Sequence, residues 1–468
     1  MGVKLVIFFI AAIGAVLAYF FSGYGLTGNG KYEFPHDGYF GPGDKKNDSV
    51  KILPFKIDIK DTAIQDLKLR LKSSRIGHHQ LEDVPDFSYG FNQKYLLKIK
   101  DYWLKSYDWR AAEAKLNSFP QFLTEIEGLK IHFLDVPPPS GKYPNVVPLL
   151  LVHGWPGNVY EFHKIIDMLT DPAKHSLGFS LAFHVIAPSI PGYGFSEQPH
   201  KKGFNHIAAA RVFRKLMKNR LKFNHYVAQG GDWGSIIVST LAKMFPEDLL
   251  GVHLNMFPSS TRDPIAIAKN LVYSIWPSLF FKDSRFSTWN YIEYYKFFLR
   301  ESGYMHIQAT KPDTVGVGLN DSPIGLAAYI LEKFSTWTHP EYVWHPDGGL
   351  TKKYTLDELL TIVSIYWFEG NIVSSQRFYK EIISGGPQAI DKKYISVPTG
   401  YAAFMRDLIV PPPFELIRKT ANFTHVTYID EGGHFAALEE PTILAKHVLD
   451  FVSGLDFIAH PNHDHDTA

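Results

Sequence analysis

An apolar run that ends in a loop and continues into a helix-like stretch occurs three times between residues 146 and 247 of this 468-residue chain, and a fourth run begins at Leu249. The three runs contain VVPLLLVHGWPG (146–157), AFHVIAPSIPGYGFS (182–196) and YVAQGGDWGS (226–235). Strands without polar alternation are buried on both faces, and intervening helices make such strands parallel. The chain is therefore predicted to belong to the α/β class, with a mostly parallel sheet between helical layers. Such sheets carry their chemistry at the carboxyl ends of the strands.

The strand and helix alternation stops in a mostly helical, aromatic-rich tract and then resumes at YISVPTGYAAF (394–404) and FTHVTYIDEGGHFAALEEP (423–441). An inserted helical tract of this kind is expected to form a lid over a functional site. We accordingly predict a first core segment over 123–258, beginning with a hairpin around Glu127-Gly128. The helical lid follows over 259–389, and the second core segment with the tail occupies 390–468.

The N-terminus contains LVIFFIAAIGAVLAYFF, which runs from Leu5 to Phe21, 17 residues without a charge. This length is near the short end of what crosses a bilayer. A cleaved signal peptide is the alternative, but its apolar region is normally shorter and ends at a small-residue cleavage site. Because the run stays bulky to its end, we predict a single membrane anchor over 1–24. A linker and an N-terminal helical extension are expected over 25–122.

Composition excludes several classes of function. The formal net charge is +1 and no long basic run is present, so the sequence gives no electrostatic reason to expect a nucleic-acid partner. Cysteine is absent, which removes disulfides, thiolate metal sites and cysteine nucleophiles.

The pattern Gly230-x-Asp232-x-Gly234 lies between an apolar strand and a helix. It matches the nucleophile elbow of an α/β-hydrolase, with Asp where Ser is usual. The nucleophile sits on a strained turn, so tiny neighbours are needed on either side. The alternative is that Asp232 merely caps the following helix. A serine esterase would need Ser at 232, and Ser235 lies off the apex of the turn.

The remaining groups of a hydrolase triad follow in the expected order of nucleophile, acid and histidine. His434 lies in a glycine-rich loop after a strand, and Asp407 follows the preceding strand, 27 residues before it. A structural histidine and a solvated carboxylate are the corresponding alternatives. Backbone N–H groups of Trp155, in the HGWPG loop, and of Trp233 are the predicted oxyanion donors.

These motifs together resemble the microsomal branch of the epoxide hydrolases, which includes the juvenile hormone epoxide hydrolases of insects. The resemblance extends over essentially the whole chain. The strings that carry it are HGWPG (153–157), GYGFSE (192–197), GGDWGS, ESGYMHIQATKPDTVG, LNDSPIGLAAYILEKFSTWT, SSQRFYKE and GGHFAALEEP, together with the apolar N-terminus.

The resemblance implies a role for each site residue. Asp232 is expected to be the nucleophile, His434 the general base and Asp407 its orienting acid, although members of the branch commonly carry Glu at that position. Tyr304 and Tyr379 are expected to hold the epoxide oxygen. No metal or organic cofactor is required, the substrate is expected to be a lipophilic epoxide, and an anchored enzyme of the endoplasmic reticulum membrane is implied.

Two other functions fit parts of the same pattern. A haloalkane dehalogenase also uses an aspartate elbow and could take halide donors from Trp155 and Trp233, whereas the lid strings favour an epoxide. A membrane-tethered lipid-binding protein could keep the fold without turnover. The sequence leaves open whether a terpenoid hormone or a foreign epoxide is the substrate, and whether the glycosylation triplets at Asn47 and Asn422 are used.

Overall fold

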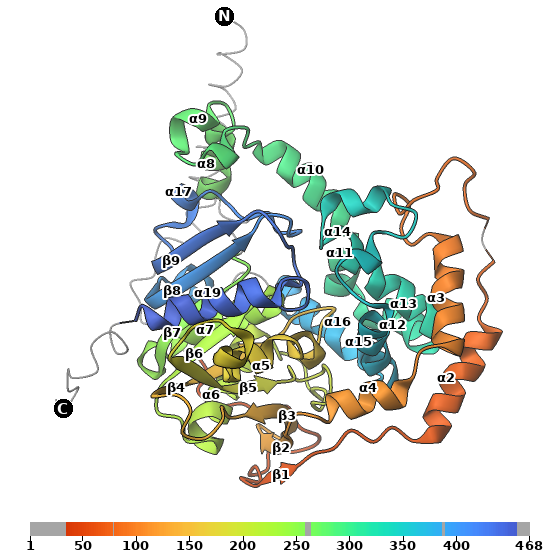
Figure 1. Cartoon of the computed structure of the whole chain (residues 1–468), viewed down its shortest axis with the longest axis horizontal. Helices are drawn as coiled ribbons and strands as arrows, with labels where there is room; N and C mark the ends of the chain where they lie inside the picture. Colours follow the sequence, from red (N-terminus) through yellow and green to blue (C-terminus); the bar gives the residue numbers. More distant parts are fainter. Residues whose placement is uncertain (1–33, 78, 258–263, 386–388, 456–468) are drawn as a thin grey trace, which may run out of the picture.

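A twisted sheet runs through the computed structural model, which describes residues 34–77, 79–257, 264–385 and 389–455 (Figure 1). Within these residues the sheet has nine strands in the order β1-β2-β3-β5-β4-β6-β7-β8-β9. The strands are β1 (Ile52–Pro54), β2 (Gln121–Ile126), β3 (Leu129–Val136), β4 (Asn145–Val152), β5 (Leu181–Pro188), β6 (Tyr226–Gly230), β7 (Leu249–Leu254), β8 (Ile395–Phe404) and β9 (Ala421–Ile429).

The six strands β5, β4, β6, β7, β8 and β9 pair in parallel. At one edge β1, β2 and β3 pair antiparallel, and β3 joins β5 in the same antiparallel way. The predicted mostly parallel sheet is thus confirmed. Leu149, Leu150, Leu151 and Val152 of β4 are all buried, as a strand covered on both faces requires. Burial of each such side chain contributes about 1.5–3 kcal/mol.

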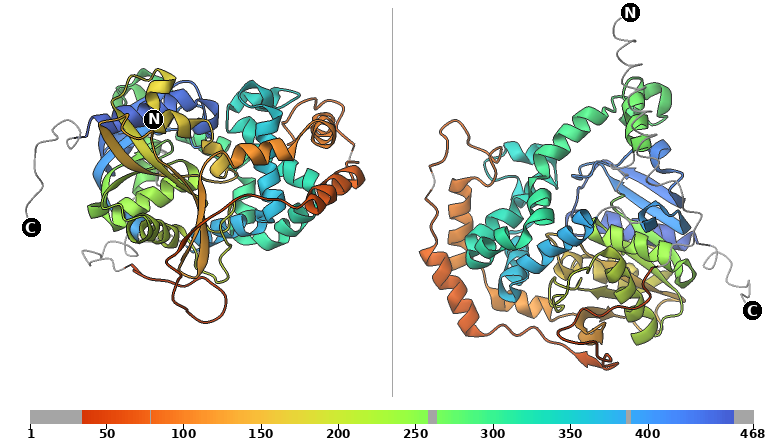
Figure 2. Two further views of the ribbon diagram at one scale, coloured as in Figure 1. Left: turned by 60° about the horizontal axis from the view of Figure 1, so that its bottom comes forward. Right: turned by 180° about the vertical axis from the view of Figure 1, so that it is seen from behind.

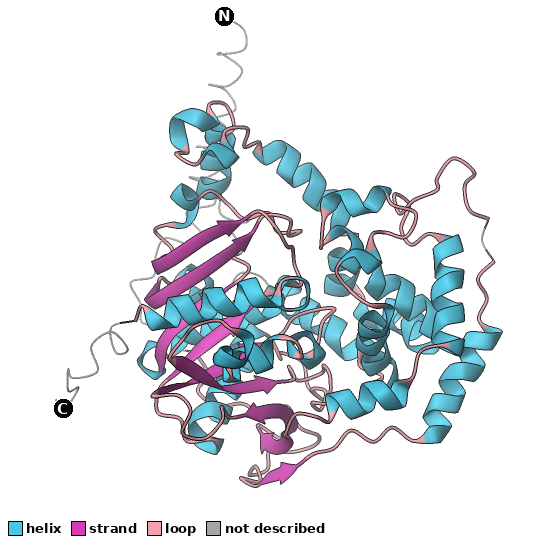
Figure 3. Cartoon of the chain, in the orientation of Figure 1, coloured by secondary structure: helices cyan, strands magenta, loops and turns pink. Residues whose placement is uncertain are grey.

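Helices cover both faces of the sheet (Figures 2 and 3). On one face α5 (Ile165–Thr170) packs with α19 (Pro441–Ser453), and on the other α6 (His206–Arg214) packs with α7 (Asp232–Met244). The short helices α17 (Phe414–Ile417) and α18 (Ala436–Glu439) lie in the loops that follow β8 and β9.

A helical tract is inserted between β7 and β8, and it stands beside the sheet in Figure 1. It contains α8 (Pro264–Tyr273), α9 (Pro277–Phe280), α10 (Tyr291–Glu301), α11 (Gly303–Thr310), α12 (Pro312–Asp321), α13 (Pro323–Leu331), α14 (Lys333–Thr336), α15 (Leu356–Glu369) and α16 (Ile372–Tyr379). The predicted lid segment contains all of these helices.

The N-terminal extension packs mainly on the helical tract. Its helices are α2 (Asp61–Ser73), α3 (Gln93–Lys105) and α4 (Trp109–Leu116), and they contact α13 and α15. The extension also supplies β1 to the sheet edge, which the sequence pattern did not indicate. The predicted hairpin around Glu127-Gly128 is formed by β2 and β3.

The predicted membrane anchor over 1–24 lies outside the described residues. In the part of the chain that the structure describes, no helix has the length and apolar character needed to cross a bilayer.

Candidate active site

Asp232 occupies a sharp turn between β6 and α7, with a φ of 47° that side chains other than glycine rarely adopt. The flanking glycines make the turn possible. A Cβ at Gly230 would lie 2.4 Å from the Gly234 carbonyl carbon, and one at Gly234 would lie 2.0 Å from the Val152 carbonyl oxygen. The residue before Asp232, Gly231, is the helix N-cap, and no side chain makes a cap hydrogen bond there. The helix-capping interpretation of Asp232 is therefore wrong.

The HGWPG loop lies beside this turn because β4 and β6 are parallel neighbours whose ends align, with Val152 paired to Gly230. The Trp155 N–H donates a hydrogen bond to Asp232 Oδ1 at 2.7 Å. Trp155 is thus placed as the predicted donor requires. The structure gives no Trp233 hydrogen bond to Asp232 among the described residues, so the second donor stays a prediction.

His434 and Asp407 meet at the ends of β9 and β8. His434 Nδ1 lies 2.8 Å from Asp407 Oδ1, and Asp407 is 1% exposed. The same oxygen accepts the Ile409 N–H at 2.9 Å, which fixes the carboxylate. The shorter aspartate side chain therefore reaches the histidine.

The other ring nitrogen of His434 faces the nucleophile candidate. His434 Nε2 lies 3.4 Å from Asp232 Oδ2. Burial lowers the pKa of His434, but the charges of Asp407 and Asp232 outweigh it, so the pKa is raised well above its usual value. The imidazole is accordingly protonated at neutral pH in the resting enzyme.

Tyr304, on α11, and Tyr379, at the end of α16, face the same region from the helical tract. Their rings lie 5.8 Å apart, and both contact Trp155, with Tyr304 stacked on its indole at 5.2 Å. Burial raises the pKa of each phenol well above its usual value. The Tyr304 and Tyr379 hydroxyls interact with each other, and the charge of Asp232 acts on both. Two protonated phenols are thus available to a ligand above Asp232.

Comparison with known proteins bears on this arrangement. Residues 52–162 match the family described as "Epoxide hydrolase N terminus", and residues 147–441 match "alpha/beta hydrolase fold". Epoxide hydrolase 1 of Sus scrofa is 47% identical over 90% of this chain and 93% of its own length. The chain belongs to the microsomal epoxide hydrolase family.

Insect relatives support the same conclusion for this epoxide hydrolase. Juvenile hormone epoxide hydrolase 1 of Ctenocephalides felis is 42% identical over 89% of both chains. The crystal structure of the juvenile hormone epoxide hydrolase of Bombyx mori superposes with a TM-score of 0.82 at 38% identity, covering 90% of this chain and 98% of that one. The predicted family, hydrolase fold and epoxide hydrolase class are confirmed.

The structure also shows site residues that the sequence argument missed. Glu439 accepts hydrogen bonds from the N–H groups of Gly433 at 2.6 Å and Phe435 at 2.7 Å, on either side of His434. Burial raises the pKa of Glu439 to about 7. The backbone N–H of His434 itself donates a hydrogen bond to the Trp337 carbonyl oxygen at 2.9 Å. The position of Glu439 in GGHFAALEEP was the available signal.

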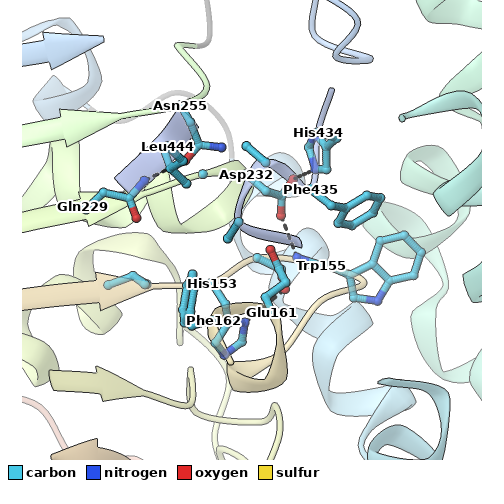
Figure 4. A pocket seen from close by; sticks show the side chains of 15 residues that line it. His153, Trp155, Glu161, Phe162, Gln229, Asp232, Asn255, His434, Phe435 and Leu444 are labelled. Carbon is cyan, nitrogen blue, oxygen red and sulfur yellow. Dashed lines mark hydrogen bonds and ion pairs between the residues drawn. The ribbon is translucent and has the colours of Figure 1, made fainter. Parts of the chain in front are cut away.

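A second missed acid, Glu161, lines a small cavity with Asp232 and His434 (Figure 4). Burial raises its pKa; the positive charge of His434 opposes this, and Asp232 and Glu439 add to it. The resulting pKa is about 8. No sequence motif used above singled out this residue.

Proposed function

We propose that this epoxide hydrolase converts lipophilic epoxides to diols through a covalent ester on Asp232. The proposal rests on the different neighbours of the two carboxylate oxygens of Asp232. Oδ1 is held by the Trp155 N–H at 2.7 Å, whereas Oδ2 faces His434 Nε2 at 3.4 Å. One oxygen is thus free to attack and the other is held as an acceptor.

In the first step Asp232 Oδ2 attacks a carbon of the epoxide, and the ring carbon–oxygen bond breaks. The alkoxide that develops takes a proton from the Tyr304 or Tyr379 hydroxyl. Both phenols keep their protons at neutral pH, and a phenol is a stronger acid than the alcohol formed by ring opening. A carboxylate needs no deprotonation before it attacks, which suits Asp at this turn.

In the second step water attacks Cγ of the ester and His434 takes its proton, while the Trp155 N–H stabilises the negative charge on Oδ1. Ester formation removes the negative charge of Asp232, one of the causes that raise the pKa of His434. The pKa of His434 therefore falls once the ester exists, which favours the neutral imidazole that the second step needs.

Single-turnover hydrolysis in heavy-oxygen water tests this route. With enzyme in excess over a lipophilic epoxide, we expect the label in the Asp232 carboxylate and an unlabelled diol, detected by mass spectrometry of the peptide and product. A diol that carries the label in the first turnover would mean that water attacks the epoxide directly. Absence of any diol would favour the lipid-binding alternative.

The proposal also covers the class of substrate and the location of the enzyme in the cell. Relatives named for juvenile hormone and a general epoxide hydrolase are similarly close to this chain, at 42% and 47% identity. We infer a lipophilic epoxide that reaches an enzyme anchored in the endoplasmic reticulum membrane through residues 1–24. Turnover of juvenile hormone measured beside a small aryl epoxide distinguishes a hormone from a foreign substrate.

A dehalogenase remains the second candidate for one reason. The indole N–H groups of Trp155 and Trp233 are buried without partners among the described residues, as halide donors would be. Figure 4, however, shows the Trp155 indole nitrogen turned away from Asp232. Halide release from a haloalkane, measured beside diol formation, decides between them.

A further inference from the structure

Asp232 and His434 line one cavity, which has about 20 Å³ available to the centre of a water molecule. That space suffices for a single water with polar neighbours. Asp232, His434 and Glu161 all line it. His434 Nε2 is buried there and makes no hydrogen bond within the described residues. Ester hydrolysis needs one water beside both Asp232 Cγ and His434 Nε2, and this cavity meets that requirement.

Local structure directs Glu161 into this cavity. The residue belongs to the short 3-10 helix η1 (Val159–Phe162), which the Asn158 side chain caps by accepting the Tyr160 N–H at 3.0 Å. The carboxyl folds back over Gly157, where a Cβ would lie 1.5 Å from Glu161 Oε2. Figure 4 shows the side chain beside Trp155 and near Asp232. Glycine at 157 therefore leaves the space that the carboxyl occupies.

The other acids beside His434 already have protein partners. Asp407 binds His434 Nδ1, and Glu439 binds two backbone N–H groups. In the described part of the chain, by contrast, the Glu161 side chain has no hydrogen bond or ion pair with a protein group. Glu161 is only partly exposed, and a carboxyl without a protein partner that lines a water-sized cavity is suited to bind water.

We propose that Glu161 holds the hydrolytic water, an inference that rests on the proposed Asp232 ester. The water donates one hydrogen to a Glu161 carboxyl oxygen and the other to His434 Nε2, which leaves a lone pair directed at Cγ. As the new carbon–oxygen bond forms, the second proton moves to Nε2. The Cγ–Oδ2 bond then breaks, and the diol leaves with Oδ2 and the proton from His434. The other hydrogen of the water stays on the regenerated Asp232 carboxyl and returns to the tyrosine that protonated the alkoxide.

The charge state of Glu161 fits an acceptor role. The titratable groups that act on it are His434, Asp232, Glu439, Tyr354 and Tyr366. With a pKa of about 8, the carboxyl is mostly protonated at neutral pH. Its carbonyl oxygen can still accept a hydrogen bond from water, and a glutamine side chain can do the same.

Rapid-quench measurement of ester formation and ester decay tests the inference. In Glu161→Met we expect formation to stay within a few-fold of the parent, decay to slow about 100-fold and the ester to accumulate, because the water is no longer positioned. In Glu161→Gln we expect decay near the parent rate at pH 7. Glu369→Met, which removes a carboxyl at the end of α15 outside the cavity, should change neither step.

Other outcomes overturn the inference. Ester decay at the parent rate in Glu161→Met would contradict the inference. An equal slowing of ester formation and ester decay would also contradict it, because it would indicate that Glu161 only supports packing. If the parent itself forms no ester, the proposed mechanism fails instead. Slow decay in Glu161→Gln at pH 7, as in Glu161→Met, would also contradict the acceptor role.

A second variant covers the case in which Glu161→Met does not fold. Gly157→Ala places a methyl group where the Glu161 carboxyl lies and should displace it from the cavity. We expect slower ester decay with ester formation retained. Decay at the parent rate, with the carboxyl shown to be displaced, would refute the proposal.

Discussion

At the scale of single residues, the acid that orients the histidine is the position where this chain departs from its family pattern. The resemblance leads one to expect Glu, whereas the chain carries Asp407. The 2.8 Å contact with His434 Nδ1 and the backbone hydrogen bond from Ile409 show how the shorter side chain is held in reach.

Replacement of Asp407 by Asn tests its importance. The amide keeps the shape but removes the charge that contributes most to raising the pKa of His434. We expect ester decay to slow about 10³–10⁴-fold, as for an Asp that orients a catalytic His elsewhere. The pH midpoint of decay should move to lower values, because an imidazole without this negative neighbour loses its proton more readily. Rapid-quench pH profiles measure both effects.

Ester formation serves as the internal control for Asp407→Asn. It should change little, since Asp232 attacks without help from a base. If decay and its pH profile match those of the parent, another carboxylate orients His434.

At the scale of elements, the junction of β6, α7 and β4 sets the geometry of the site. Close approach of α7 to the end of β4 brings the Asp232 turn next to the HGWPG loop. Gly234 lies at that contact, in the first turn of α7. The strained Asp232 backbone is therefore supported by packing between helix and strand.

Gly234→Ala should reduce the free energy of unfolding by about 1–3 kcal/mol, because the methyl group would overlap the Val152 carbonyl oxygen. Gly318→Ala is the matched control. It is also in a helix, α12, and a Cβ there meets no atom within 4 Å. This control should gain up to about 1 kcal/mol from helix propensity. Urea unfolding of both variants measures the difference, and equal effects would exclude the packing argument.

At the scale of the whole molecule, all the site residues lie between Trp155 and Glu439, far in sequence from the apolar N-terminus. The described chain begins at Phe34, which packs against Phe245 at a ring separation of 5.2 Å. The core of the catalytic body is formed by residues from Ile57 to Leu455.

Deletion of residues 1–33 should release the enzyme from membranes and leave turnover of a small, water-soluble epoxide within a few-fold of the parent. The physical reason is that 17 consecutive apolar residues are long enough for a bilayer, whereas the site lies in the body. Membrane flotation and diol assays on the same preparations provide the measurement. Persistent flotation of the shortened chain would place the membrane contact elsewhere.

The sequence by itself determined the parts of this protein that depend on local order. Buried strand runs specified a parallel sheet, and the glycines around Asp232 specified a strained turn, because each follows from backbone sterics and burial within a short segment. The order of Asp232, Asp407 and His434, with the tyrosines of the family pattern, indicated the site.

Only the tertiary structure decided which groups without a motif enter that site. Glu161 lies in no motif used here, and its place in the site depends on the packing of η1 against α18, the helix that carries Glu439. The sequence also did not indicate that β1 joins the edge of the sheet. Nor did it indicate that the N-terminal helices pack on the inserted tract. These features arise from contacts between segments far apart in the chain, and no local pattern of residues records such contacts.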